Sequence, residues 1–232
     1  MTETDKNNLQ NRFTLLCRRL GETCQQSPDE STIAKWWEIL DGKYSEPGRR
    51  YHGWNHIAQC LREFDGVAHM LRWPLASETA FWFHDAEYDF NPANENIKLS
   101  AKLAFEFGKG LGLGFMAQGA IERRIYATDH AMCAADDTQD CRLISSIDLA
   151  ILGQSWEHYL AYARNIRREY VHVVQETFRD NRLAFLKSML ARSAIYRHEA
   201  FAAKYEGAAR ANMMLEAGIL ESEQKTTLLN PR

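Results

Sequence analysis

The sequence predicts an all-α fold. Apolar residues recur at spacings of three and four along most of the 232 residues, which is the period of an amphipathic helix. No sustained alternation of apolar and polar residues, which would indicate β-strands, is present. A chain of this length can bury an extensive core without disulfides. We therefore expect a single helical domain over residues 1–232, with C-terminal helices from about 155–218 packing on the core.

The N-terminal third is expected to hold three helices. Apolar residues at helical spacing predict the first two over 9–20 and 33–40, and a Ser-Pro break separates them. After a Pro-Gly pair, a third apolar stripe over 54–71 predicts a helix whose first turns hold His52 and His56.

The middle of the chain is expected to hold four more helices. Pro74 suits the first turn of a helix, and the run up to His84 is apolar on nearly every side, as in a helix at the centre of a domain. A loop with Asn91 and Pro92 follows. The next three helices are predicted near 94–107, 115–130 and 143–151, with four glycines between 108 and 114 breaking the chain between the first two.

Beyond Gly153, long helical patterns run to about Gly218. Their clearest apolar stripes cover residues 159–174 and 183–195. We expect these helices either to close the bundle or to form a homodimer.

Composition argues against several classes of protein. The formal net charge of -3 gives no overall attraction to a nucleic-acid polymer or an anionic membrane. No window approaches the roughly 18 apolar residues that a membrane span requires. The five cysteines are odd in number, widely spaced and without a C-x-x-C pair. We expect reduced thiols and a cytoplasmic protein.

Four residues in three separate segments have the side chains of a metal site. His56 lies in the third predicted helix, His84 and Asp85 end the fourth, and Asp148 lies in the apolar run ISSIDLAIL. Unpaired carboxylates rarely stay buried, so a cation is expected near both aspartates. Simpler explanations remain open on spacing alone. A His-Asp doublet often ends a helix or lies on the surface, and an aspartate in an apolar run can cap a helix or pair with an arginine.

The order of these residues resembles that of the HD-domain superfamily of metal-dependent phosphohydrolases. The similarity is to a bacterial branch described only as predicted metal-dependent phosphohydrolases of that superfamily. It covers most of the chain and rests on these motifs in order: RRYHGWNHI (49–57), FWFHDAEYD (81–89), NENIKLSA (94–101), ATDH (127–130), IDLAILG (147–153) and IRREY (166–170).

The resemblance implies an HD-type helical bundle in which His56, His84, Asp85 and Asp148 bind a divalent metal ion. The residues do not distinguish Mn, Mg, Zn, Co, Fe and Ni. The implied reaction is hydrolysis of a small phosphorylated metabolite, expected to be a nucleotide, by metal-activated water.

Neighbouring residues are candidates for catalysis. Related proteins often carry two acids after the doublet, but here Tyr88 replaces the first and Asp89 keeps the second. Asp89 is therefore the first candidate for proton transfer or water positioning and Glu95 the second, with helix capping as the alternative for both.

Substrate binding is assigned to Arg50, His52 and His130. Arg50 and its neighbour Arg49 are candidate phosphate clamps, or else a solvated basic pair. His52 would contact phosphate, bind a second ion or form a hydrogen-bonded wall. His130 would complete a two-metal site or interact through its charge with the end of its helix.

Two other functions remain open. Proteins of the family that the chain resembles often carry an acid at the position of Tyr88. Its replacement favours a protein that binds a nucleotide or phosphate without hydrolysing it. A di-iron oxygenase, as some relatives of the HD-domain superfamily are, would need His130 as an additional ligand, with His52 as a further candidate.

Overall fold

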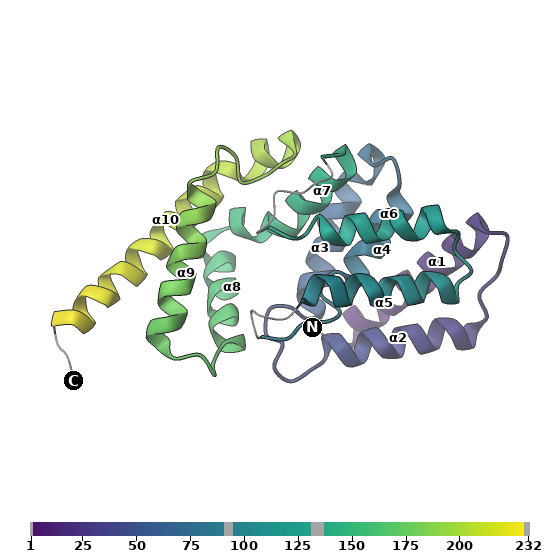
Figure 1. Ribbon diagram of the computed structural model, residues 1–232, viewed down its shortest axis with the longest axis horizontal. Helices are drawn as coiled ribbons and strands as arrows, with labels where there is room; N and C mark the ends of the chain where they lie inside the picture. The colour runs from purple at the N-terminus through teal and green to yellow at the C-terminus, as the bar shows by residue number, and fades with distance from the viewer. Residues whose placement is uncertain (1, 91–94, 131–136, 230–232) are drawn as a thin grey trace. The chain divides into compact units, whose positions relative to one another are not determined.

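The computed structural model describes the backbone of residues 2–90, 95–130 and 137–229, and side chains as far as residue 222 (Figure 1). Within these ranges the chain forms ten α-helices and two short 3₁₀ helices, and no strand. The predicted all-α fold is confirmed. The loop residues Asn91 and Pro92, and Cys133, lie outside the described residues.

The chain divides into two compact units, Met1–Asp148 and Leu149–Arg232. All candidate site residues lie in the first unit. That the helices beyond about residue 155 pack on the core stays a prediction.

The first unit contains seven α-helices and one 3₁₀ helix among its described residues. They are α1 (Glu3–Thr23), α2 (Glu30–Tyr44), α3 (Trp54–Val67), η1 (Ala68–Met70), α4 (Pro74–Phe83), α5 (Asn96–Gly110), α6 (Phe115–Tyr126) and α7 (Gln139–Asp148). Helix α4 is central, because it contacts α1, α3, α5 and α6. Every residue from Ala76 to Phe83 is buried, as the apolar run predicts.

Aromatic side chains fill the core around α4. The fully buried ring of Phe13 packs against Trp37, Trp82 and Phe107, with ring centroids 6.1, 5.3 and 5.8 Å away. Burying side chains of this size contributes about 1.5–3 kcal/mol each. This core fixes α4, and therefore the position of His84 at its C-terminal end.

The start of α4 is fixed by a buried carboxylate. Asp140 accepts hydrogen bonds from the backbone N–H groups of Arg72 and Trp73, at 2.9 and 3.0 Å, and from the guanidinium of Arg124. Arg124 also donates to Ser77 in α4. The pair thus joins α4, α6 and α7 without a cost in unpaired buried charge.

The structure corrects several predicted bounds. Helix α3 begins at Trp54, so His52 precedes it: the chain turns before the helix, where the N–H of Gly53 donates to the carbonyl oxygen of Tyr51 at 2.8 Å, and Gly53 is the extended N-cap residue. Helix α3 ends at Val67 and a 3₁₀ turn carries the chain on, so the stripe to residue 71 is not one helix.

The bounds of the helices on either side of the glycine-rich segment also differ. Helix α5 continues through Gly108 to Gly110, and the chain turns at Gly112, whose φ of 74° suits glycine. Helix α6 ends at Tyr126, where Thr128 donates to a carbonyl of the last turn, so His130 lies beyond the helix.

The second unit contains the 3₁₀ helix η2 (Leu149–Gly153) and helices α8 (Trp156–Glu169), α9 (Gln175–Leu190) and α10 (Glu199–Leu229). The predicted stripes at 159–174 and 183–195 therefore run past the ends of α8 and α9. Gly153 allows η2 to approach α10 closely, because a Cβ there would lie 2.5 Å from that of Tyr205. Asn212 of α10 donates to the carbonyls of Leu152 and Gln154.

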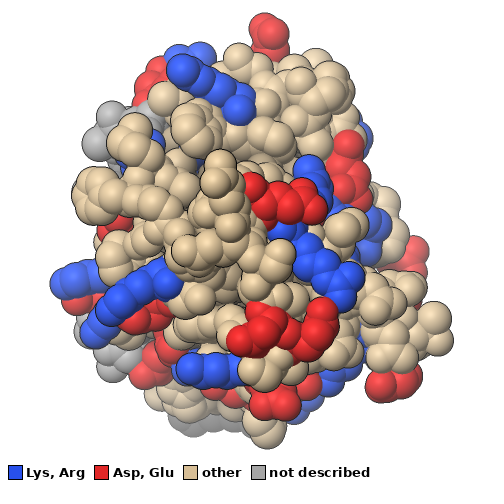
Figure 2. All heavy atoms as spheres, turned by 90° about the vertical axis from the view of Figure 1, so that its right-hand side faces the viewer, with Lys and Arg blue, Asp and Glu red and all other residues tan. Residues whose placement is uncertain are grey.

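Charged side chains of both signs are interspersed on the face that Figure 2 shows. In the described part of the chain, no helix combines the length and the apolar character needed to cross a membrane. The cytoplasmic location stays a prediction.

Candidate metal centre

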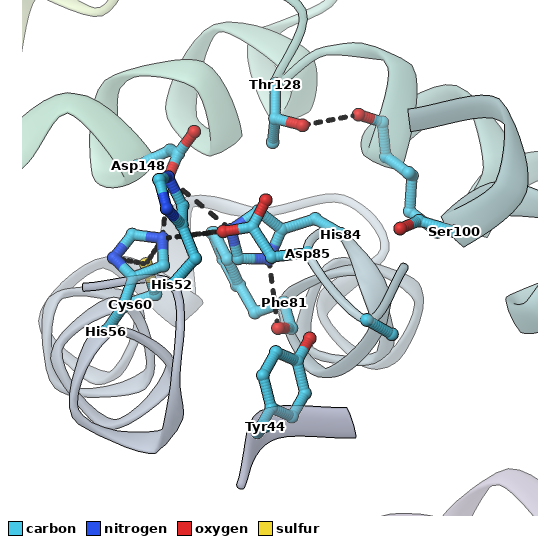
Figure 3. A network of polar contacts seen from close by, with 12 residues as sticks. Tyr44, His52, His56, Cys60, Phe81, His84, Asp85, Ser100, Thr128 and Asp148 are labelled. Carbon is cyan, nitrogen blue, oxygen red and sulfur yellow. Dashed lines mark hydrogen bonds and ion pairs between the residues drawn. The ribbon is translucent and has the colours of Figure 1, made fainter. Parts of the chain in front are cut away.

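Three elements of the first unit bring the four predicted ligands together (Figure 3). His56 lies in the first turn of α3, His84 caps the C-terminus of α4 with Asp85 next to it, and Asp148 is the last residue of α7. The two histidines are 3% and 2% exposed, and the carboxylates are mostly buried.

The donor atoms of this cluster face one another. Nε2 of His56 lies 3.1 Å from Nε2 of His84, 3.0 Å from Oδ1 of Asp148 and 3.3 Å from Oδ2 of Asp85. Nε2 of His84 lies 3.2 Å from Oδ2 of Asp85 and 3.5 Å from Oδ1 of Asp148.

These separations fit donors that share one ion. Two donors each about 2.05 Å from an ion are roughly 2.9 Å apart at a right angle and about 3.3 Å apart at the tetrahedral angle. The five donor separations run from 3.0 to 3.5 Å. The set of two imidazoles and two carboxylates also has the chemistry of a site for a borderline divalent ion.

Cys60 is a donor that the sequence prediction missed. His56, Cys60, His84 and Asp148 each offer one ligand atom, and these atoms all lie within 4.8 Å of one another. Asp85 is not in that set, although its Oδ2 is within 3.3 Å of both histidines, so we count five donors. The available signal was the spacing of four between His56 and Cys60, which places both on one helical face.

The orientation of the His84 ring is fixed by the helix that carries it. Its Nδ1 lies 3.1 Å from the carbonyl oxygen of Phe81, which can only accept a hydrogen bond. Nδ1 therefore carries a proton, and in the neutral ring Nε2 presents its lone pair to the cluster. This is the tautomer that a metal ligand requires.

The charges of the cluster are strongly coupled. Burial alone would lower the pKa of His84, but the charge of Asp85 and hydrogen bonds to Asp148 and Asp85 raise it well above its ordinary value. Burial would also lower the pKa of His56. This pKa is nevertheless raised, by the charges of Cys60 and Tyr51 and by hydrogen bonds to the two carboxylates.

The carboxylates shift in the opposite direction. Burial would raise the pKa of both, but His84 and His56 hold the pKa of Asp85 well below its usual range. Hydrogen bonds to His130, His56 and His84 likewise lower the pKa of Asp148 well below its usual range. The imidazoles and carboxylates of the cluster thus favour one another's charged forms.

The doublet does end helix α4, with His84 as its C-cap, but the simpler explanations for Asp148 do not hold. Among the described residues, the side-chain partners of Asp85 and Asp148 are histidines, so neither carboxylate pairs with an arginine or caps a helix.

Arg49 holds the two segments that supply ligands. Its guanidinium donates to the carbonyl oxygens of Asp85, Ala86 and His52, and to the carboxylate of Glu46. Only 1% of its side chain is exposed. Both sequence interpretations of Arg49, phosphate clamp and solvated basic residue, are therefore wrong, because every nitrogen of the guanidinium already faces an acceptor in the protein.

His52 lies beside the cluster. Its ring stacks on Tyr88 with centroids 4.0 Å apart and planes 21° apart, and its centroid is 6.1 Å from that of His56. Tyr88 thus supports His52 beside the cluster. A contact of His52 with phosphate stays a prediction.

His130 reaches the cluster from the segment after α6. Its Nε2 lies 2.8 Å from Oδ2 of Asp148, and its Nδ1 lies 3.5 Å from the hydroxyl of Ser145. The suggested interaction with a helix end is wrong, because α6 ends four residues earlier. A role of His130 in substrate binding stays a prediction.

The remaining candidates lie on the surface. Asp89 is exposed, and its backbone exchanges two hydrogen bonds with the side chain of Asn96. Glu95 is exposed, pairs with Lys98 and precedes α5 without a side-chain capping bond. Arg50 is exposed as well. Their catalytic and substrate-binding roles stay predictions.

No protein-family model matches this chain, and no curated protein is significantly similar to it. The resemblance to the HD-domain superfamily therefore stays a prediction.

Proposed function

We propose that this chain is a metal-dependent phosphohydrolase. A divalent ion would be held by His56, His84, Asp85 and Asp148, and the substrate would be a small phosphorylated metabolite, with nucleotides as the first class to test. The observation that carries the proposal is the convergence of two imidazoles and two carboxylates from three elements, at separations that fit one ion.

An ion bound there would lower the pKa of water, orient it and offset charge on a phosphoryl oxygen. The chain's own residues prepare the site. Phe81 holds the His84 ring in the ligating tautomer, and Arg49 holds the turn that carries Asp85. Because these supports are already formed, binding the ion requires little reorganisation of the backbone.

Phosphate recognition is the less constrained part of the proposal. Arg49 is fully engaged by protein acceptors, so the exposed Arg50 beside it is the arginine of this segment that we assign to phosphate. Asp89 and Glu95 follow the doublet on the exposed side of the same region and are the acids that we assign to proton transfer.

The test is phosphate release from a panel of nucleotides and sugar phosphates. Protein stripped with a chelator is assayed alone and with each divalent ion restored. Asp85→Ala removes a ligand, and Asp180→Ala, which removes an exposed aspartate of α9, is the matched control. Metal-dependent release that is lost only in Asp85→Ala supports the proposal.

Other outcomes select the alternatives. Tight nucleotide binding without turnover with any ion favours a non-hydrolytic binding protein. Two irons per chain with oxygen-dependent chemistry favour the oxygenase, for which the two oxygens of Asp148, each facing a different histidine, are the supporting observation.

A further inference from the structure

We propose that Cys60 is a fifth donor of this centre and determines which ion it selects. A thiolate next to two imidazoles favours Zn²⁺, Fe²⁺ or Co²⁺ over Mg²⁺. This inference rests on the proposed metal centre, and it names the ion class that the residue types alone leave open.

The position of Cys60 is the first argument. It follows His56 by four residues in α3, so both side chains lie on the same face of a regular helix. Its side chain is buried, and its Sγ lies within 4.8 Å of ligand atoms on His56, His84 and Asp148. Figure 3 shows the sulfur beside the His56 ring.

The distance to His56 is the second argument. A sulfur at about 2.3 Å and a nitrogen at about 2.05 Å from one ion are roughly 3.1 Å apart at a right angle and about 3.6 Å apart at the tetrahedral angle. Sγ of Cys60 lies 3.7 Å from Nε2 of His56 and 3.8 Å from its Nδ1. The sulfur therefore lies at a distance from Nε2 of His56 that two ligands of one ion can have.

The third argument is the polarity around the thiol. Among the described residues, its hydrogen-bonding partners are the two ring nitrogens of His56. A cysteine that only fills space in a core contacts apolar groups. Cys17 of α1 is fully buried and is not one of the clustered donors, and it is therefore the matched control.

The test uses the metal-stripped full-length protein titrated with Co²⁺ and followed by absorption spectroscopy. Cobalt bound to a thiolate gives a sulfur-to-metal charge-transfer band in the near ultraviolet, separate from its visible d–d bands. We expect this band in the wild type and in Cys17→Ala. We expect Cys60→Ser to lose it while keeping d–d bands from the remaining ligands.

Selectivity gives a second measurement. In a competition between Zn²⁺ and Mg²⁺, the preference for Zn²⁺ should fall at least about tenfold in Cys60→Ser. Losing a residue that only hydrogen-bonds to a ligand already costs about tenfold in metal affinity, so losing a ligand should cost no less. If Cys60→Ser does not fold, the wild-type spectrum alone decides the question.

Bound Co²⁺ with d–d bands but no charge-transfer band in the wild type would overturn the role of Cys60 and leave the hydrolase proposal standing. Absence of any bound Co²⁺ would overturn the metal centre itself, and with it both proposals. An unchanged Zn²⁺ preference in folded Cys60→Ser would also overturn the inference.

Discussion

Nε2 of His130 lies 2.8 Å from Oδ2 of Asp148, while Oδ1 of the same carboxylate faces His56. Partners of this kind orient a ligand and typically contribute 10–100-fold to metal affinity. We therefore expect His130→Ala to weaken metal binding by about 10–100-fold without abolishing it. Calorimetric titration of the stripped protein measures this change.

The matched control is His69→Ala, which removes an exposed histidine of η1 in the same unit. It should bind the ion as the wild type does. If His130→Ala also binds like the wild type, the contact with Asp148 does not support the centre. Complete loss of binding would instead make His130 a ligand.

Arg49 should be needed for stability as well as for metal binding. Arg49→Met leaves the carbonyl oxygens of Asp85 and Ala86 without their donor, and one unsatisfied buried acceptor costs about 1–3 kcal/mol. Lysine is expected to be a poor substitute, because one ammonium group cannot reproduce the geometry of the guanidinium. Urea unfolding measures the loss.

The neighbouring Arg50→Met provides the contrast. Because Arg50 is exposed, its loss should change the free energy of unfolding by no more than about 0.5 kcal/mol. If Arg50 contacts phosphate, the variant should show a raised KM. Equal destabilisation by the two variants would contradict the role given to Arg49.

Part of this centre was predictable from the sequence. The helical period placed His56, His84 and Asp148 on buried surfaces, and it predicted the apolar helix α4 that carries the doublet. The four residues do lie together, but their spacing alone leaves a metal site undecided, and the set comes from the resemblance to the HD-domain superfamily. The burial of these positions was predictable because the period of the apolar residues reports burial directly. That the four residues bind an ion stays a prediction.

Other parts were not predictable, for physical reasons. The partners of Arg49 are backbone carbonyls 36 and 37 positions away, and a backbone carbonyl has no sequence signature. Cys60 reads as an ordinary core cysteine until its distance to His84 and Asp148 is known. The helical spacing of His52 to His56 predicts that both lie in α3, but the chain turns at residues 51–53 and the helix starts only after Gly53.

The raised pKa values of His56 and His84 predict opposite effects of pH on two properties. A raised pKa stabilises the metal-free fold fully below about pH 6.5, and this contribution is lost as pH rises through the folded-state value. Metal binding needs neutral imidazoles, so affinity should rise over the same window. Urea unfolding of the metal-stripped protein and metal titration, both from about pH 6 upward, test the two trends. If stability and metal affinity rise or fall together with pH, the prediction is contradicted.

The second unit offers a test of buried against exposed ion pairs. Arg182 and Glu216 are 7% and 12% exposed, and Tyr159 also donates to Glu216. Glu216→Gln leaves a buried guanidinium without its counter-charge, which should cost about 3–5 kcal/mol of unfolding free energy. Lys187→Ala breaks the exposed pair with Glu221 and should cost no more than about 1 kcal/mol. Chemical denaturation measures both losses of unfolding free energy. Similar losses in the two variants would contradict the claim that the buried pair contributes more because it is buried.

The most direct test of the central claim is the metal stoichiometry and affinity of wild-type protein, His84→Ala and His69→Ala, with circular dichroism confirming that all three remain helical. We predict one divalent ion per chain in the wild type and in His69→Ala, and no retained ion in His84→Ala. A helical His84→Ala protein that binds one ion with wild-type affinity would contradict the claim that this cluster is the metal centre.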